Sequence, residues 1–292
     1  MVDNNFFFET PCGVHFSVLQ LIYRSDFYDK LAEIHVKLAI KVDFFDKKGW
    51  SKGFFRYLCC IIKKMDGMMT IQEAIQQRHS VRRYDDKPIE QEKVAALQAL
   101  IEQCNAESGL NIQLVTDEPT AFDCRMAHYG RFSGVSDYFA MVGRKDEPDL
   151  DEKIGYYGEK LVLEAQMLGL NTCWVALTYK KKPEFLQIRD GERLRCVISV
   201  GYGTSQGASH RIKSVEKVSK VDGAMPDWFR RGVESALLAP TAINQQKFTF
   251  SLTNGNQVSA KAGWGYFSKV DLGIVKLHFE IGAGMENFEW KS

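Results

Sequence analysis

The sequence predicts an α+β fold, because helical and strand signals alternate along the chain and one pair of strands should form a hairpin. Apolar residues recur three or four positions apart in the segments 94–104, 151–168 and 270–281, the spacing of helices with one buried face. Asn254 and Gly255 lie between two short β-prone segments, and this dipeptide favours a tight antiparallel turn. Such a hairpin makes a doubly wound parallel sheet the weaker alternative.

The signals for individual elements become sharp from Thr70 onward. Thr70 and Glu73 have the spacing of a capping box, in which both side chains satisfy free amides at a helix start. Pro88 is expected in the first turn of a second helix, and a third helix should cover 151–168, where Gly169 can end it in a left-handed conformation. Four short segments are expected to be strands: 113–115, 138–142, 173–177 and 197–200.

The second half of the chain follows a segment rich in Gly, Ser and Lys, 201–223, which we expect to be a linker. Pro226 then opens a helix over 227–238. The remaining elements expected are two hairpin strands and a last helix, at 247–252, 257–260 and 270–281. Both halves show the order helix, polar break, strand, long helix. This order indicates two half-repeats, at about 69–205 and 224–292.

Residues 1–67 differ from the rest of the chain because they are crowded with Phe, Tyr and Lys and carry no functional motif. Part of this segment permits either a strand or an amphipathic helix, and the pattern does not decide between them. A helix start of good quality follows Met69 directly. We therefore expect a functional domain over 68–292, preceded by an extension that is either an accessory segment or an upstream reading of the message.

Composition and charge exclude several classes of partner. The 292 residues are 45% hydrophobic and 26% charged, with a net charge of +1, so neither nucleic acid nor a membrane is expected as a partner. No run of eighteen apolar residues and no secretory signal occurs. The seven cysteines include no Cys-x-x-Cys pair, which favours reduced thiols over disulfides or zinc. A cytoplasmic location is the expectation that fits these observations.

The first segment that could carry chemistry is basic and follows the first helix. It reads Arg78-His79-Ser80-Val81-Arg82. In an extended chain Arg78, Ser80 and Arg82 share one face and present two guanidinium groups and a hydroxyl, a suitable donor set for a phosphate. The alternative is a solvated basic run at a helix end, where the helix dipole favours cations.

The second segment joins a helix to a strand and reads Ala239-Pro240-Thr241-Ala242-Ile243-Asn244-Gln245-Gln246. Its small side chains would let the backbone approach a planar ligand closely, and Asn244 and Gln246 can both donate and accept hydrogen bonds. The alternative is an ordinary connecting loop.

Taken together, the two segments resemble the nitroreductase-like FMN oxidoreductases. That family has Arg-x-Ser-x-Arg before an aromatic residue, an acidic residue and a proline, which here reads from Arg78 to Pro88. About thirty residues later it has Ala-Pro-Ser-x-x-Asn-x-Gln, and its members are usually homodimers that hold each FMN between subunits. In this chain the expected position has 106–111 without the proline, and the intact loop occurs only at 239–246.

The displaced loop makes the chain similar to a fused pseudo-dimer in which each half kept one part of a site. It resembles the single-chain branch known as putative TM nitroreductases, over roughly residues 69–290, and leaves the first 67 residues unaccounted for. Internal fusion would remove the usual need for a homodimer, so a monomer or weak homodimer is expected.

The resemblance implies FMN as cofactor, NADH or NADPH as co-substrate, and a small-molecule electron acceptor such as a nitroaromatic or a quinone. It implies a flavin-centred reaction with no catalytic side chain and no metal. It also suggests that the strand around Trp174 passes behind the flavin and that a second basic pair reaches the phosphate. The residues expected at the cofactor are Arg78, His79, Ser80, Arg82, Trp174, Val175, Ala176, Arg211, Lys213, Pro240, Thr241, Ala242, Asn244 and Gln246. The alternative function is a non-catalytic flavin-binding sensor or storage protein.

Overall fold

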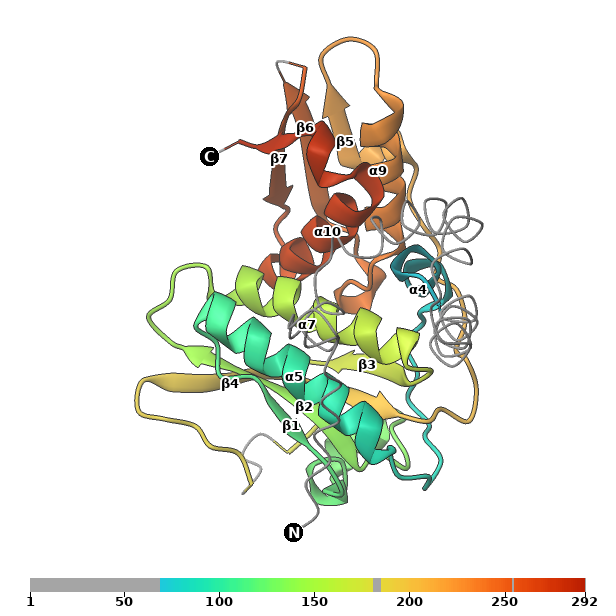
Figure 1. Ribbon diagram of the computed structural model, residues 1–292, viewed down its shortest axis with the longest axis vertical. Coiled ribbons are helices and arrows are strands. Elements are labelled where there is room, and N and C mark those ends of the chain that lie inside the picture. Colours follow the sequence, from blue (N-terminus) through green and yellow to red (C-terminus); the bar gives the residue numbers. More distant parts are fainter. Residues whose placement is uncertain (1–68, 181–184, 254, 292) are drawn as a thin grey trace, which may run out of the picture. The chain divides into compact units, whose positions relative to one another are not determined.

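Two four-stranded sheets and the helices that cover them make up the part of the chain that the computed structural model describes, residues 69–180, 185–253 and 255–291 (Figure 1). The interpretation of residues 1–67 as an extension lies outside these residues. So does Asn254 of the expected hairpin turn. Within the described ranges no helix has the length and apolar character that crossing a bilayer demands.

The first sheet is antiparallel throughout, in the order β1-β2-β4-β3. Its strands are β1 Gln113–Val115, β2 Asp137–Arg144, β3 Asn171–Val175 and β4 Glu192–Gly201. β2 is buried along its length except at Arg144, because both faces of this strand are covered. The strands expected at 138–142 and 197–200 are therefore present but longer. The strand expected at 173–177 ends at Val175, where its pairing with Val197 ends.

Three helices and a short turn of helix belong to the first half. They are α4 Ile71–Gln77, α5 Gln91–Ser108, α6 Arg125–Tyr129 and α7 Leu150–Met167. The capping box of α4 is confirmed, since Thr70 Oγ1 accepts from the Glu73 amide and the Glu73 carboxylate accepts from the Thr70 amide. Gly169 follows α7 with φ of +76°, the left-handed conformation expected there. No sequence signal had indicated α6 or the 3-10 turn η2 Pro119–Ala121.

The expectation that Pro88 lies in the first turn of α5 is wrong. Glu90 is the N-cap, in extended backbone, and the helix begins after it. The Glu90 carboxylate forms an ion pair with Lys87 and accepts from the Tyr202 hydroxyl, and Ile89 is buried beside them. These tertiary contacts hold the segment after Pro88 extended and delay the helix.

The second sheet has the order β5-β6-β7-β8, with β5 and β8 parallel to their neighbours. Its strands are β5 Ser219–Val221, β6 Phe248–Thr253, β7 Gln257–Ala262 and β8 Glu289–Trp290. β6 and β7 pair antiparallel, which confirms the hairpin. The expectation of a plain linker over 201–223 is wrong, because it contains α8 Val215–Val218 and β5. Val215 and Val218 are buried in the core, which fixes this otherwise polar stretch.

The helices of the second half are α9 Asp227–Leu238 and α10 Ser268–Ala283, with 3-10 turns η3 Ala242–Asn244 and η4 Met285–Asn287. α10 packs against α7 of the first half, against α9 and against β6 and β7, and it lies between α7 and the second sheet in Figure 1. The helices α7 and α10 cross closely because each of them has a glycine where it faces the other. A Cβ at Gly155 would lie 2.0 Å from the Val270 carbonyl oxygen, and one at Gly273 would lie 1.9 Å from that of Glu152.

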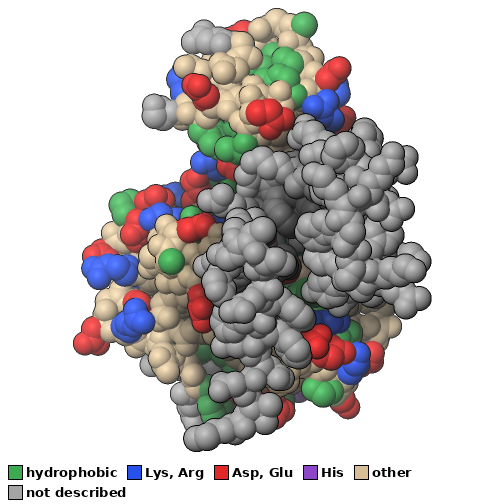
Figure 2. Space-filling model, viewed as in Figure 1, with side chains coloured by type: hydrophobic (Ala, Val, Ile, Leu, Met, Phe, Trp, Pro, Cys, Tyr) green, Lys and Arg blue, Asp and Glu red, His purple; other side chains and the backbone are tan. Residues whose placement is uncertain are grey.

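One hydrophobic core therefore runs through both halves, with Ile154 and Leu161 of α7 in the same cluster as Ile274 and Phe279 of α10. The order α5, β1, β2, α7 in the first half is repeated as α9, β6, β7, α10 in the second. Fusion of two half-repeats stays a proposal that this order supports. On the described surface visible in Figure 2, basic and acidic side chains are interspersed rather than gathered by sign.

Candidate functional site

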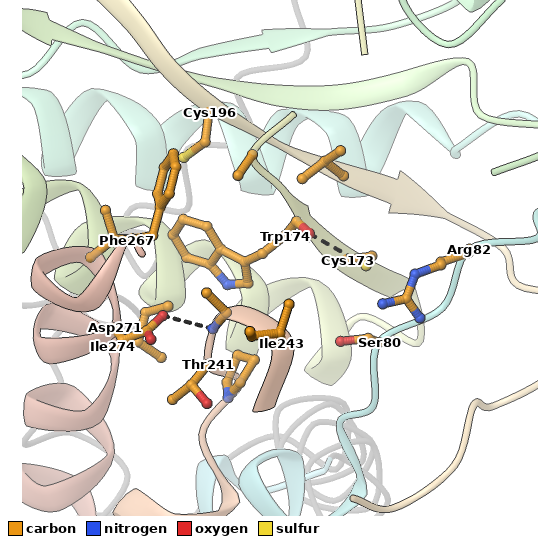
Figure 3. A pocket seen from close by; sticks show the side chains of 15 residues that line it. Ser80, Arg82, Cys173, Trp174, Cys196, Thr241, Ile243, Phe267, Asp271 and Ile274 are labelled. Atoms are coloured by element: carbon orange, nitrogen blue, oxygen red, sulfur yellow. Dashed lines mark hydrogen bonds between the residues drawn. The ribbon is translucent and has the colours of Figure 1, made fainter. Parts of the chain in front are cut away.

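A cavity lies where the basic segment, strand β3, the loop after α9 and the start of α10 meet (Figure 3). It contains about 580 Å³ of space between its lining atoms, including the part open to solvent. Its lining residues are Ser80, Arg82, Cys173, Trp174, Val175, Ala176, Cys196, Pro240, Thr241, Ala242, Ile243, Phe267, Val270, Asp271 and Ile274.

The basic segment contributes a hydroxyl and a cation to this cavity. Ser80 pairs with Thr172 of β3 in a parallel bridge, and the Val81 amide donates to the Thr172 carbonyl, so the sheet holds the segment in place. The buried Val81 side chain anchors it further. Arg82 is exposed, and its guanidinium lies 6.0 Å from the Phe132 ring. Among the described residues no carboxylate is within ion-pair distance of it, which leaves its charge available to an anion.

The loop after α9 is tied to α10 by Asp271. The Asp271 carboxylate accepts from the Ala242 amide at 2.9 Å and from the Gln245 side-chain amide at 2.7 Å. Asp271 is 3% exposed, and burial raises the pKa of its carboxyl to about 6 although both hydrogen bonds oppose the rise. The loop is thus held at the cavity by a side chain of the helix opposite, rather than by its own sequence alone.

Ile243 stands at the cavity in an unusual conformation. Its φ of 49° and ψ of 26° lie in the left-handed region, which is rare for a β-branched residue, and its side chain is 93% exposed. Phe267, on the other side of the cavity, also has a positive φ, of 56°. Two non-glycine residues in this conformation line one cavity. Such strain gathers at ligand sites, where it costs about 1–3 kcal/mol per residue.

Strand β3 supplies the part of the cavity wall between Ile243 and Phe267. Trp174 is half-buried, with its indole between Phe267 and Ile243 in Figure 3. Cys173 and the β4 residue Cys196 also line the cavity, and burial raises the pKa of both thiols, to about 12 for Cys196. The two thiols therefore remain protonated at neutral pH and contribute apolar surface, not thiolate nucleophiles.

Eight of the residues expected at the cofactor line this cavity and six do not. Those present are Ser80, Arg82, Trp174, Val175, Ala176, Pro240, Thr241 and Ala242. Residues from the basic segment and from the loop some 160 positions later therefore share one cavity, as the motifs had suggested. The six outside the lining are Arg78, His79, Arg211, Lys213, Asn244 and Gln246.

Four of those six contact one another, because Arg211 and Lys213 form hydrogen bonds with the loop residues Asn244 and Gln246. The Arg211 carbonyl accepts from the side-chain amides of Asn244 and Gln246, at 2.9 and 2.7 Å. The Lys213 ammonium donates to the carbonyls of Gln245 and Gln246, at 2.8 and 2.7 Å. The segment 211–213 and the loop thus brace each other.

The other two lie at the start of the basic segment. Arg78 is 4% exposed and its guanidinium faces Glu159 at 3.8 Å and the Leu238 carbonyl at 3.5 Å. Burial lowers the Arg78 pKa and the Glu159 carboxylate offsets part of that change. His79 has a buried Nδ1 with no hydrogen-bond partner among the described residues.

Sequence reasoning missed seven lining residues: Cys173, Cys196, Ile243, Phe267, Val270, Asp271 and Ile274. Ile243 lies inside the loop motif, and its φ could not be inferred from its residue type. Asp271 did carry a signal, since an acidic residue in the first turn of the last helix could have been taken as an anchor for a neighbouring loop. Phe267 and Cys196 carried none.

Comparison with solved structures gives the fold. A nitroreductase of Thermotoga maritima, described as putative, superposes with a TM-score of 0.56 at 21% identity, covering 75% of this chain and 86% of that one. A Desulfovibrio desulfuricans nitroreductase, described as putative and solved in complex with FMN, gives a TM-score of 0.42 at 18% identity. The match covers 54% of this chain and 99% of that one. An NADH dehydrogenase/NAD(P)H nitroreductase of Parabacteroides distasonis, also described as putative, gives a TM-score of 0.41 at 23% identity. The match covers 51% of this chain and 95% of that one. No curated protein matches the chain.

The family comparison covers most of the described chain. The model of the family described as "Putative TM nitroreductase" matches residues 70–283, which is well over half of the 292 residues. The match begins at Thr70, the N-cap of α4, and runs to Ala283, the last residue of α10. It includes every residue that lines the cavity. With the α+β architecture and the fold shared with the Thermotoga maritima protein, the chain belongs to this nitroreductase family.

Proposed function

We propose that this protein is an FMN-dependent oxidoreductase that uses NADH or NADPH to reduce a small-molecule acceptor at the cavity. The observation that carries the proposal is the meeting of Ser80 and Arg82 with the loop residues 240–242 on one cavity. Family membership agrees with it, and so does the FMN present in the Desulfovibrio desulfuricans relative.

The residues present fit FMN in three respects. Arg82 and Ser80 are donors suited to a phosphate, and Arg82 has no carboxylate partner in the part of the chain that the structure describes. Three of the four loop residues at the cavity, Pro240, Thr241 and Ala242, are small, which permits close approach of a flat ring. Trp174, Phe267 and Val175 supply apolar surface against which a ring system can pack.

FMN, when bound, supplies a ring that takes up a hydride from a nicotinamide and passes electrons on to an acceptor. The chain then needs few reactive groups of its own. Arg82 would hold the phosphate or stabilise negative charge on the reduced ring. Burial raises the pKa of the Cys173 and Cys196 thiols, so they stay protonated and add no competing thiolate at the cavity. A backbone amide of the β3 segment 174–176 is suited to contact the ring.

A ping-pong order follows from one cavity serving both partners. NADH or NADPH would leave before the acceptor enters by the same opening. Nitroaromatics and quinones are the acceptors we propose for assays, because planar aromatic molecules can pack against a ring from its open side. No nucleic acid or membrane partner is proposed, and a monomer or weak homodimer in the cytoplasm is the assembly and location we propose.

An anaerobic absorbance experiment tests the proposal. The purified protein is incubated with FMN, desalted, and its flavin spectrum is recorded before and after addition of NADH or NADPH. We expect bound flavin whose visible absorbance bleaches with one nicotinamide and returns on addition of a quinone. Bound flavin that neither nicotinamide bleaches would favour the non-catalytic sensor or storage alternative. A colourless protein would reject flavin binding altogether.

A further inference from the structure

Behind the cavity wall lies a buried polar cluster whose carboxylate and imidazole the proposed function does not use. Its centre is Glu159 of α7, whose side chain is fully buried. Glu159 Oε2 accepts from the Trp174 indole Nε1 at 2.8 Å, and Oε1 lies 3.0 Å from Nε2 of His278 on α10. The Arg78 guanidinium lies 3.8 Å from the same Oε1. Burying a carboxylate in a protein core costs free energy unless the carboxylate is paired and hydrogen-bonded. The presence of this cluster in the core therefore calls for an explanation.

The hydrogen bonds of Glu159 and His278 determine the net charge that these two side chains carry together. The other ring nitrogen of His278, Nδ1, lies 3.1 Å from the Ser235 carbonyl oxygen, which can only accept, so Nδ1 carries a proton. One more proton must lie between Nε2 and Glu159 Oε1. Whether it sits on the ring or on the carboxyl, Glu159 and His278 together carry no net charge. The positive charge of Arg78 is then the net charge of the cluster.

The member of the cluster that reaches the cavity is Trp174. Its indole N–H is held by Glu159, and its six-membered ring occupies the space left by the missing side chain of Gly158. A Cβ at Gly158 would lie 2.4 Å from the Trp174 ring. Two consecutive residues of α7 thus set the position of the indole, one by a hydrogen bond and one by having no side chain. The same indole lines the cavity (Figure 3).

We propose that Glu159 is a positioning residue for the cavity. Together with His278 it forms a charge-neutral, proton-sharing pair that fixes the Trp174 indole as the wall against which the flavin packs. This inference deepens the proposed function and rests on it for the identity of the ligand. The positioning itself does not depend on which ligand binds.

The charge-neutral pair makes a prediction about replacement of the carboxylate by an amide of the same shape. In Glu159→Gln the side-chain carbonyl can accept from Trp174 and the amide can donate to Nε2 of His278, whose Nδ1 proton still reaches Ser235. Both hydrogen bonds and the net charge of the cluster are kept. Glu159→Leu removes both hydrogen bonds and leaves the indole N–H and the imidazole without partners.

The test measures FMN affinity by quenching of flavin fluorescence. We expect Glu159→Leu to weaken FMN binding by about tenfold or more, and Glu159→Gln to recover most of that loss. In a Trp174→Phe background, which has no indole N–H to position, Glu159→Leu should add less than about a twofold change, because the two residues act as one unit. Two outcomes would overturn the proposal. One is an equal loss of FMN affinity from Glu159→Leu in the Trp174 and Trp174→Phe backgrounds. The other is a Glu159→Gln protein that binds FMN as weakly as Glu159→Leu does.

A second readout needs no flavin. In protein labelled with 5-fluorotryptophan, the ¹⁹F resonance of Trp174 is identified by its loss in Trp174→Phe. It should shift in Glu159→Leu and return toward the original position in Glu159→Gln. An unshifted resonance in Glu159→Leu would defeat the positioning role. If the unaltered protein binds no FMN, the proposed function fails, and this resonance still decides the role of Glu159.

Should Glu159→Leu not fold, Gly158→Ala tests the position of the Trp174 indole on which the proposal depends. It leaves the buried charges untouched and drives a methyl group into the Trp174 ring. Weaker FMN binding with a shifted Trp174 resonance supports the wall position. Unchanged affinity would contradict it.

Discussion

At the scale of single residues, the site depends on polar side chains placed where burial changes their chemistry. Asp271 anchors the loop through two hydrogen bonds, yet burial raises the pKa of its carboxyl to about 6. Arg82 is the opposite case, an exposed cation with no carboxylate close to it in the described chain. Asp271 holds the loop in place, and Arg82 lines the cavity.

The raised pKa of Asp271 predicts a pH dependence of stability. Because the folded-state pKa, about 6, exceeds the ordinary value of 3.8, the folded protein binds the proton more tightly. This stabilisation is complete below about pH 4 and is lost as the pH rises through 6, and it amounts to about 3 kcal/mol. This pH-dependent stabilisation should be measurable by urea unfolding of the unaltered protein and of Asp271→Asn at several pH values.

In that comparison, the free energy of unfolding of the unaltered protein should fall relative to Asp271→Asn between pH 4 and 7. Asp86→Asn, at an exposed carboxylate, serves as the control and should show a much smaller change. A constant difference between the unaltered protein and Asp271→Asn across this range would contradict burial as the cause.

Replacing Arg82 separates its two possible roles. Arg82→Ala should weaken FMN binding by about ten- to a hundredfold, because one charged hydrogen bond contributes about 1.5–3 kcal/mol. Titration with FMN and with riboflavin distinguishes phosphate from ring. A larger loss for FMN than for riboflavin assigns Arg82 to the phosphate, and equal losses assign it to the ring. The neighbouring exposed Arg83→Ala is the matched control, and an Arg82→Ala protein that binds like this control would remove Arg82 from the site.

At the scale of elements, the crossing of α7 and α10 determines the cavity. α10 carries Val270, Asp271 and Ile274 to it, and α7 supports Trp174 from behind. Gly155 and Gly273 let these helices meet backbone to backbone. The distance between the two helices therefore sets how far the first half of the site lies from the second.

Gly273→Ala tests this dependence. Its methyl group would meet the Glu152 carbonyl oxygen, so the helices must separate, which costs about 1–3 kcal/mol or more. We expect a lower melting temperature together with weaker FMN binding. Glu102→Ala, at an exposed position of α5, is the control. Reduced stability with full FMN affinity would show that the helix spacing does not control the cavity.

At the scale of the molecule, residues 69–292 form one compact unit, and the match to the family starts at residue 70. We therefore expect a protein lacking residues 1–67 to fold. Its thermal unfolding should be a single cooperative transition, and it should bind FMN as the full chain does. An unfolded product, judged by circular dichroism, would show that the first 67 residues are part of the domain.

The proposed fusion of two half-repeats predicts the stoichiometry. The first half contributes the basic segment to the cavity and the second half contributes the loop, so we expect a single complete site. Titration of the full chain should give one FMN per chain, and Arg82→Ala and Pro240→Gly should weaken the same binding event. Two independent flavins per chain would contradict the shared site.

The sequence by itself determined the features that depend on neighbours a few positions apart. The capping box at Thr70, the left-handed Gly169 and the β6–β7 hairpin were all readable, because their hydrogen bonds and backbone preferences are local. The two segments that share the cavity were also found, but from their resemblance to a family and not from periodicity. Where a tertiary contact opposed a local signal, as at Glu90 or in the segment 201–223, the local prediction was wrong.

Only the tertiary structure decided which side chains face the cavity and which support it. Arg78 and Asn244 belong to the predicted motifs, yet one is buried beside Glu159 and the other braces a neighbouring loop. Asp271 bonds to the amide of Ala242 on the preceding loop, and Glu159 contacts His278 on another helix, 119 positions away. A side chain's surroundings arise from the packing of α7 against α10, and no pattern within a few residues contains that information.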